Sequence, residues 1–182
     1  MEVKTLQDII RHGAATFGSQ TAFRYKVKKE IQDKSYLELQ NDTMAVSRMV
    51  EGFGMKGMHI ALIGTTSYQW ISCYFGITGS GSVAVPVDAQ LPAQAIWELL
   101  NRADVKMLIY DEIRADVTAG IKEHCPQISC TISMQAESHQ PEIYSLSCLL
   151  SQYAGNYEAN LCPNQLATIL YTSGTTGKSK GV

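Results

Sequence analysis

The sequence predicts an α/β fold in which a layered, mostly parallel sheet is flanked by helices. Three observations predict this class. Short runs rich in Val, Ile and Leu alternate with segments of helical periodicity, which is the pattern of strand–helix–strand units. Several of these runs are apolar throughout, as expected for strands covered on both faces. The 182 residues, of which 45% are hydrophobic and 18% charged, can bury a core of their own.

The first third of the chain predicts a helix, two short strands and a second helix. Apolar residues spaced three and four apart predict a helix over residues 6–17. Alternation in Ala22–Val27 predicts a strand, and the polar Lys28–Glu30 a turn into a second strand. Ser35 and Glu38 have capping-box spacing, so a helix should begin there and end at the glycines near residue 52. Its expected buried stripe consists of Leu37, Met44, Val46, Met49, Val50 and Phe53.

Strands and helices alternate through the rest of the sequence. Strand-like runs are found at His59–Ile63, Ser82–Val87, Val105–Tyr110, Ile128–Met134 and Gln165–Tyr171. Thr66 and Gln69 predict a cap for a helix that passes through Trp70, and Pro92 predicts the start of another. Further helices are expected over residues 112–124 and 144–153. A surface loop is expected over residues 135–141.

Charge and hydropathy exclude several classes of partner. Fifteen Lys and Arg residues against seventeen Asp and Glu residues give a formal charge of −2, with no block of one sign. Nothing in this balance supports binding to nucleic acid or to a membrane surface. The longest apolar runs, such as Ile60–Gly64, are too short to span a bilayer, so no transmembrane segment is expected. The N-terminal residues contain no apolar stretch of signal-peptide type.

The five cysteines predict free thiols. Their number is odd and no C-x-x-C pair occurs, which favours reduced thiols in a cytoplasmic protein. The densest group of metal-ligating residue types is His124 and Cys125 with Cys130 and His139. It lacks a second ligand pair at zinc spacing, so we interpret these cysteines as packing residues and predict no metal site.

The C-terminal segment, residues 172–182, carries the clearest chemistry. Hydroxyl residues, glycines and two lysines follow an apolar strand. Glycines allow backbone N–H groups to approach a ligand closely, and successive N–H groups in such a turn form a concave anion site. The hydroxyls add donors, and Lys178 or Lys180 adds a positive charge. The segment therefore predicts a cradle for a polyphosphate, with a flexible Gly/Ser/Thr tail as the alternative.

Two other glycine motifs fit this sequence less well. Gly177-Lys178-Ser179 matches the second half of the P-loop pattern G-x-x-x-x-G-K-[ST], but Thr172 stands where its first glycine belongs. A P-loop also opens a helix after its lysine, whereas Gly181 follows closely here. Gly79–Ala84 fits the dinucleotide pattern G-x-G-x-x-[GA], but it leads into a strand-like run, so we predict a tight turn.

The segment from Tyr171 to Val182 resembles the signature of the adenylate-forming superfamily, Y-T-S-G-T-T-G-x-P-K-G-V. This superfamily holds acyl-CoA synthetases, luciferases and peptide-synthetase adenylation domains. One specified position departs from the signature, since Ser179 stands where proline is usual. Upstream, Ser35–Leu39 is similar to the family segment T-Y-x-E-L, and Gly81 with Val85–Asp88 is similar to G-x-x-x-V-P-[IL]-[DN]. The resemblance thus covers nearly the whole chain in order.

The resemblance implies an ATP-dependent acid–thiol ligase of the acyl-CoA synthetase type. A carboxylate would attack the α-phosphate of ATP to give acyl-AMP and pyrophosphate, and the thiol of coenzyme A would then take the acyl group. Mg²⁺ would neutralise phosphate oxygens. The variable position Lys178 is expected in solvent. The residues that the signature places at the triphosphate are Thr172, Ser173, Gly174, Thr175, Thr176, Gly177 and Lys180.

The family's adenine, acyl and magnesium sites and its acylation lysine follow this region of the chain. We therefore expect residues 1–182 to be a partial N-terminal AMP-binding domain, truncated after the phosphate loop 171–182. Its catalytic residues should lie beyond residue 182, and it should be inactive alone. Two alternatives stay open. One is a natural short, non-catalytic binding or assembly module that self-associates through an exposed sheet edge. The other is a P-loop nucleotidase.

Overall fold

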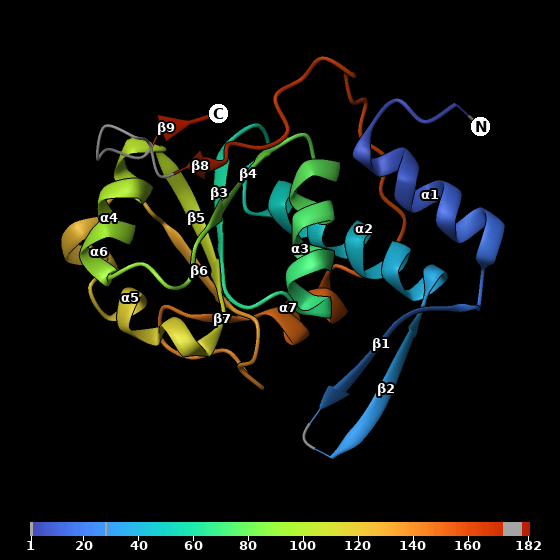
Figure 1. Cartoon of the computed structure of the whole chain (residues 1–182), viewed down its shortest axis with the longest axis horizontal. Helices are drawn as coiled ribbons and strands as arrows, with labels where there is room; N and C mark the ends of the chain where they lie inside the picture. Colours follow the sequence, from blue (N-terminus) through green and yellow to red (C-terminus); the bar gives the residue numbers. More distant parts are fainter. Residues whose placement is uncertain (1, 28, 173–179) are drawn as a thin grey trace.

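Within residues 2–27, 29–172 and 180–182, which the computed structural model describes, five parallel strands form the largest sheet (Figure 1). Their order across the sheet is β4-β3-β5-β6-β7, and every neighbouring pair is parallel. The predicted α/β class is therefore confirmed. The strands are β3 (His59–Ile63), β4 (Val83–Val87), β5 (Val105–Tyr110), β6 (Cys130–Ser133) and β7 (Tyr144–Ser145).

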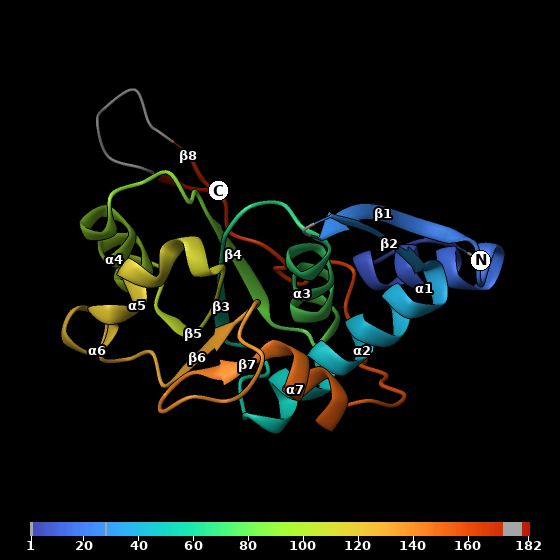
Figure 2. The same ribbon diagram turned by 90° about the horizontal axis from the view of Figure 1, so that it is seen from below.

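Helices cover both faces of this sheet (Figure 2). One face carries α2 (Tyr36–Gly52), α3 (Tyr68–Gly79) and α7 (Leu146–Gln152), and the other carries α4 (Ala93–Arg102), α5 (Ala115–Ala119) and α6 (Ile121–His124). Alternate residues of a strand enter the two cores, which is why these strands are apolar throughout. Because β4 and β5 lie on opposite sides of β3, the direction in which the sheet grows reverses there.

An N-terminal lobe lies beside the first face. Its helix α1 (Leu6–Phe17) packs against α2 and α3, and β1 (Thr21–Val27) and β2 (Glu30–Ser35) form an antiparallel hairpin that projects from the body (Figure 1). The predicted capping box is present, since Ser35 Oγ accepts the Glu38 N–H and the Glu38 carboxylate accepts the Ser35 N–H. The expected helix–strand–strand–helix order of this lobe is confirmed.

Two local predictions about helices α2 and α3 were wrong. The N-cap of α3 is Ser67 rather than Thr66, because the Ser67 hydroxyl accepts the Trp70 N–H at 3.1 Å. In α2, Leu37 is exposed and Met44 is half-buried, while Leu39 and Thr43 are buried. The buried face of α2 is displaced because this helix packs against α1 and α3 as well as against α7.

The predicted helix over residues 112–124 is broken into three short pieces. A 3₁₀ turn, η1 (Glu112–Arg114), is followed by α5 and α6, which meet at Gly120. An ideal Cβ at Gly120 would lie 2.5 Å from Cζ2 of Trp97 in α4, so the Trp97 indole packs directly on the Gly120 backbone. The predicted helix over residues 144–153 begins later than expected, because Tyr144–Ser145 pair with β6 as β7. Strand β6 is shorter than the predicted run 128–134.

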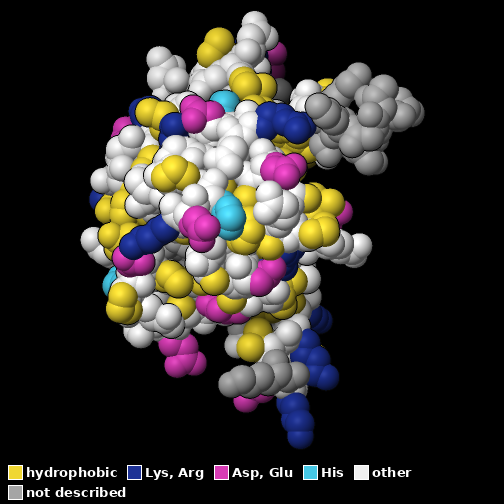
Figure 3. Space-filling view, turned by 90° about the vertical axis from the view of Figure 1, so that its left-hand side faces the viewer, with side chains coloured by type: hydrophobic (Ala, Val, Ile, Leu, Met, Phe, Trp, Pro, Cys, Tyr) yellow, Lys and Arg dark blue, Asp and Glu magenta, His cyan; other side chains and the backbone are white. Residues whose placement is uncertain are grey.

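The cysteines are dispersed in the described part of the chain, and charges of both signs mix on one face of the molecule. All five cysteines are free thiols, and Cys125 and Cys130 belong to the cores on opposite faces of the sheet. Acidic and basic side chains are interspersed on the face shown in Figure 3. Among the described residues, none of the helices is both long and apolar enough to cross a membrane.

Candidate functional site

The two ends of the predicted phosphate-binding signature lie side by side. Strands β8 (Tyr171–Thr172) and β9 (Lys180–Gly181) pair antiparallel, with Thr172 opposite Lys180. Leu170 and Val182 extend the pairing by exchanging two backbone hydrogen bonds, each of 2.9 Å. The structure thus brings together the backbones of the first and last predicted site residues. The other predicted site residues lie outside the described residues: Ser173, Gly174, Thr175, Thr176 and Gly177.

The chain reaches this hairpin along the edge of the central sheet. Residues 165–170, which we call the approach strand, run parallel to β4 with a bridge between Thr168 and Ala84. The Ala84 N–H donates to the Ala167 carbonyl at 2.9 Å, and the Ile169 N–H donates to the Ala84 carbonyl at 3.0 Å. The predicted strand over 165–171 is therefore only partly present: residues 165–170 contain one isolated bridge, and regular strand structure begins with β8 at Tyr171. Because the pairing is parallel, Thr172 lies near the carboxyl ends of the sheet strands, where open α/β sheets bind ligands.

Polar residues close the carboxyl ends of β3 and β5, at the same edge of the sheet. Asp111 follows β5 and is buried, and its Oδ2 accepts the hydroxyl of Thr65, which follows β3, at 2.8 Å. Its Oδ1 accepts the Ile113 N–H at 3.1 Å. An ideal Cβ at Gly64 would lie 2.5 Å from Cβ of Asp111, so the two strand ends approach each other only because Gly64 has no side chain. Asp111 therefore joins the carboxyl ends of β3 and β5, where the order of the sheet reverses.

The loop between β4 and α4 is held by a buried arginine. The Arg114 guanidinium donates to the carbonyl oxygens of Ala89 and Leu91, at 2.7 and 2.9 Å. It also forms a two-bond pair with the Asp116 carboxylate, each bond 2.9 Å long. The hydrogen bond from Arg114 lowers the pKa of Asp116, and the same bond raises the pKa of Arg114. Leu91 of this loop and Tyr171 of β8 both pack against the core on the α4 face of the sheet.

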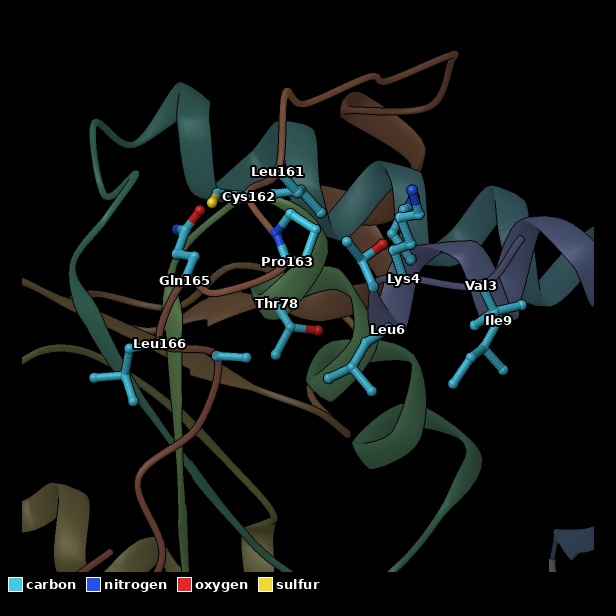
Figure 4. A pocket seen from close by; sticks show the side chains of 13 residues that line it. Val3, Lys4, Leu6, Ile9, Thr78, Leu161, Cys162, Pro163, Gln165 and Leu166 are labelled. Atoms are coloured by element: carbon cyan, nitrogen blue, oxygen red, sulfur yellow. The ribbon is translucent and has the colours of Figure 1, made fainter. Parts of the chain in front are cut away.

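Two hollows lie away from this edge. One, of about 320 Å³, is lined by the start of α1, by Thr78 at the end of α3, and by residues 161–167 (Figure 4). It lies toward the amino end of β4, because Gln165 bonds to the Gly81 carbonyl just before that strand. The other, of about 400 Å³, lies between α5, α6 and residues 141–144, and an ion pair of Lys122 with Glu142 borders it. Neither hollow is lined by residues of the hairpin.

Sequence reasoning did not identify Thr65, Asp111 or Arg114. A signal was available for the first two, because each follows closely after a predicted buried strand, and the carboxyl ends of parallel strands share one edge. Arg114 offered no such signal. Its partners, the carbonyl oxygens of Ala89 and Leu91, are backbone atoms in a distant loop.

The chain is similar to known proteins along nearly its whole length. The chain is 28% identical over 180 residues to a mycosubtilin synthase of Bacillus subtilis, and the match covers 98% of this chain and 6% of that protein. It is 22% identical over 184 residues to a medium-chain-fatty-acid–CoA ligase of Ectopseudomonas oleovorans, with coverage of 96% and 33%. A solved anthranilate CoA ligase in complex with anthranoyl-AMP superposes with a TM-score of 0.87 at 20% identity, covering 98% of this chain and 34% of that one.

The chain is much shorter than the proteins it matches. It spans about a third of the medium-chain ligase and of the solved anthranilate ligase, and a far smaller part of the mycosubtilin synthase. The solved structure shares the fold over nearly all of the present chain. A model of the family described as AMP-binding enzyme matches residues 10–182. Because that match includes the doubly wound sheet and the hairpin that closes the signature, the chain belongs to the AMP-binding enzyme family.

Proposed function

We propose that residues 1–182 are the N-terminal part of the AMP-binding domain of an ATP-dependent acid–thiol ligase. In the proposed reaction a carboxylate oxygen attacks the α-phosphorus of ATP, and the bond to pyrophosphate breaks to leave acyl-AMP. The thiol of coenzyme A then attacks the acyl carbon, and AMP leaves. The observation that carries the proposal is the pairing of Thr172 with Lys180 at the carboxyl edge of a parallel sheet. Two matched proteins are named as CoA ligases, which supports the acyl-CoA synthetase type.

The loop closed by this hairpin would hold the β- and γ-phosphates. Its proposed ligand groups are the N–H groups and hydroxyls of Thr172, Ser173, Gly174, Thr175, Thr176 and Gly177, and the ammonium of Lys180. Preorganised donors and positive charge stabilise the charge that shifts onto the leaving pyrophosphate. Mg²⁺ would share that task by binding phosphate oxygens. Lys178, at a variable position of the signature, is assigned no ligand role.

The pairing of Lys180–Gly181 also favours this proposal over a P-loop nucleotidase. A P-loop lysine opens a helix, whereas the residues that follow Lys178 and Ser179 form strand β9. The two interpretations differ in their products. A ligase releases pyrophosphate when its acid is present, and a nucleotidase would hydrolyse ATP without any acid.

A matched pair of lysine variants tests the proposal in the full protein that contains these residues. The assay is acid-dependent exchange of labelled pyrophosphate into ATP. We expect Lys180→Ala to lower the exchange rate by about 10²–10³, the usual loss for one preorganised charge-stabilising donor. Lys178→Ala should exchange at the wild-type rate. Equal losses in both variants, or exchange that does not depend on an acid, would contradict the proposal.

We also propose that the 182-residue chain does not adenylate any acid alone. The anion site that we assign to this chain would hold only the phosphates, and a nucleotide held by its phosphates alone binds weakly. The purified chain should give no pyrophosphate exchange with any acid that the full protein accepts. Turnover by the chain alone would refute this.

The cytoplasm is the proposed location, because the five cysteines are free thiols.

A non-catalytic assembly module is a second candidate, and the open edge of the sheet favours it. Because Ala167 and Ile169 supply the backbone bonds to β4, the N–H and carbonyl of Thr168 point away from that strand. Leu166 and Leu170 flank it and are about half exposed. Such an edge can pair with a second copy of the chain.

Sedimentation velocity at rising concentration tests this candidate. Self-association through the edge should be abolished by Leu166→Lys. It should persist in Ile31→Lys, which changes an exposed residue of the projecting hairpin. A monomer at all concentrations would remove this candidate, and the intact mass of the native gene product would then show whether a 182-residue form exists in cells.

A further inference from the structure

The approach strand is tied to helix α3 by a hydrogen bond between two side chains. The hydroxyls of Tyr74 and Thr168 lie 2.9 Å apart, although the two residues are 94 positions apart in the sequence. The Tyr74 ring is stacked on Trp70, with ring centroids 5.6 Å apart and an interplanar angle of 7°. It also meets the ring of Phe75 edge to face at 5.6 Å. Two aromatic contacts therefore fix the ring whose hydroxyl reaches the strand.

Backbone pairing joins this strand to the sheet at one bridge, beside which Ile169 packs against the core. Strand β3 pairs with β4 along all of His59–Ile63, whereas the approach strand shares a single bridge with β4, at Thr168. Two backbone hydrogen bonds with Ala84 form that bridge. Gln165, the first residue of the approach strand, donates a side-chain hydrogen bond to the Gly81 carbonyl. With so few backbone bonds, a side-chain bond at the centre of the strand contributes a large share of its positioning.

We propose that Tyr74 is a positioning residue for the phosphate loop. Its hydroxyl holds Thr168, and thereby positions the backbones of Thr172 and the paired Lys180, which are the two ends of the proposed loop. Thr172 is four residues beyond Thr168, about 13 Å along an extended chain, so Tyr74 acts through the strand and not by touching the phosphates. The inference rests on the proposed function, because it assigns a positioning residue to the same loop.

The expected effect is a loss of affinity for phosphate. Without the bond, the strand would occupy the position that allows phosphate binding for only a fraction of the time. The apparent affinity is then reduced to that fraction of the intrinsic affinity. One hydrogen bond between neutral groups corresponds to roughly a three- to tenfold change in such an equilibrium. A contact that serves stability alone would lower the midpoint of unfolding without changing the affinity of the folded chain.

Binding of inorganic tripolyphosphate to the whole 182-residue chain tests the inference. The affinity is measured by NMR from the amide shifts of Leu170 and Val182, which flank the hairpin. Tyr74→Phe and Thr168→Val should each weaken binding by roughly three- to tenfold. The double variant should be no weaker than either single variant, because both remove the same bond. Thr168→Ser keeps the hydroxyl and should bind as the wild type does.

Tyr68→Phe is the matched control. It removes another tyrosine hydrogen bond of α3, from the Tyr68 hydroxyl to Asp42 Oδ2 at 2.6 Å, on the side that faces α2. It should lower the urea midpoint and leave the affinity for tripolyphosphate unchanged. Wild-type affinity in Tyr74→Phe, or equal weakening in Tyr68→Phe, would overturn the inference and leave the proposed loop standing. A wild-type chain that shows no binding at millimolar tripolyphosphate would instead overturn the proposed loop itself.

Discussion

At the scale of single residues, Arg114 satisfies backbone groups that no sheet ladder reaches. The carbonyl oxygens of Ala89 and Leu91 lie in the turn that connects β4 to α4, and each accepts a bond from the guanidinium. Charged donors give stronger hydrogen bonds than neutral ones, and the planar guanidinium can serve both carbonyls and the Asp116 carboxylate at once. This one side chain therefore fixes the turn between β4 and α4.

Replacement of Arg114 tests this role. Arg114→Met should lower the free energy of unfolding by about 2–3 kcal/mol, because two carbonyl groups lose a charged donor. Urea denaturation measures the loss. Asp116→Asn keeps both carbonyl bonds and removes an ion pair whose carboxylate is about half exposed, so its cost should stay below about 1 kcal/mol. Equal losses of unfolding free energy in the two variants would show that Arg114 stabilises the chain through the ion pair and not through the loop.

The thiols differ in burial and should differ in reactivity. Burial raises the pKa of Cys73 and of Cys130 to about 12, and it also raises the pKa of Cys125. Cys162 is exposed and Cys148 is half-buried. Because the thiolate is the nucleophile, iodoacetamide at neutral pH should alkylate Cys162 first and Cys148 next. The other three should react only after unfolding, as counted by intact mass. Early labelling of Cys73 would contradict the packing described here.

At the scale of elements, the break between α5 and α6 comes from a neighbouring helix. The indole of Trp97 in α4 lies on the backbone of Gly120 and donates to the Val117 carbonyl at 3.0 Å. Its ring also stacks on His124, with centroids 3.9 Å apart. The periodicity of residues 112–124 suits one continuous helix, but the volume of the indole decides where the backbone can run.

A methyl group at the break should be costly. Gly120→Ala places its Cβ against Trp97, so the free energy of unfolding should fall by about 1–3 kcal/mol, the usual cost of overpacking. Thermal unfolding followed by circular dichroism measures it. In a Trp97→Leu background the same change should cost much less, because the ring is gone. If it costs as much there, the break has another cause.

At the scale of the whole molecule, the sheet is buried on both faces and the ionisable groups lie around it. Hydrogen bonds from backbone and side-chain donors lower the pKa of four carboxyl groups in different elements. The carboxyl groups are those of Asp8, Asp33, Glu38 and Asp116. Asp8 and Glu38 cap helices, Asp33 joins β1 to β2, and Asp116 pairs with Arg114, so their ionisation is coupled to folding in several parts of the chain.

Stability should therefore fall in acid. Each of these carboxyls has a lower pKa in the folded chain than in the unfolded chain, where values are 3.8 for Asp and 4.5 for Glu. Their contribution is complete above these unfolded values and is lost as pH falls through the folded values. Urea midpoints should be level from neutral pH to about pH 5 and decline below it. A midpoint that rises on acidification below about pH 4 would contradict this sign.

Local physics explains what could be predicted from the sequence. The Ser35–Glu38 capping box places the start of α2, and the apolar runs place β3, β4 and β5, because caps and periodicity depend on neighbours in the chain. The signature at residues 171–182 likewise identified the family, since it is a contiguous string. The roles of its individual residues at the triphosphate stay predictions.

Other features were decided by tertiary structure. The order of strands, the pairing of the approach strand with β4, the start of α3 at Ser67 and the break at Gly120 each depend on which surfaces meet. Tyr74 and Thr168 meet across 94 positions, and Arg114 meets a loop more than twenty residues away. Sequence by itself determined most of the elements and the family signature, because those are short-range patterns. Tertiary structure alone decided which segments the two ends of the signature pair with, because burial and close packing select among contacts that are distant in the chain.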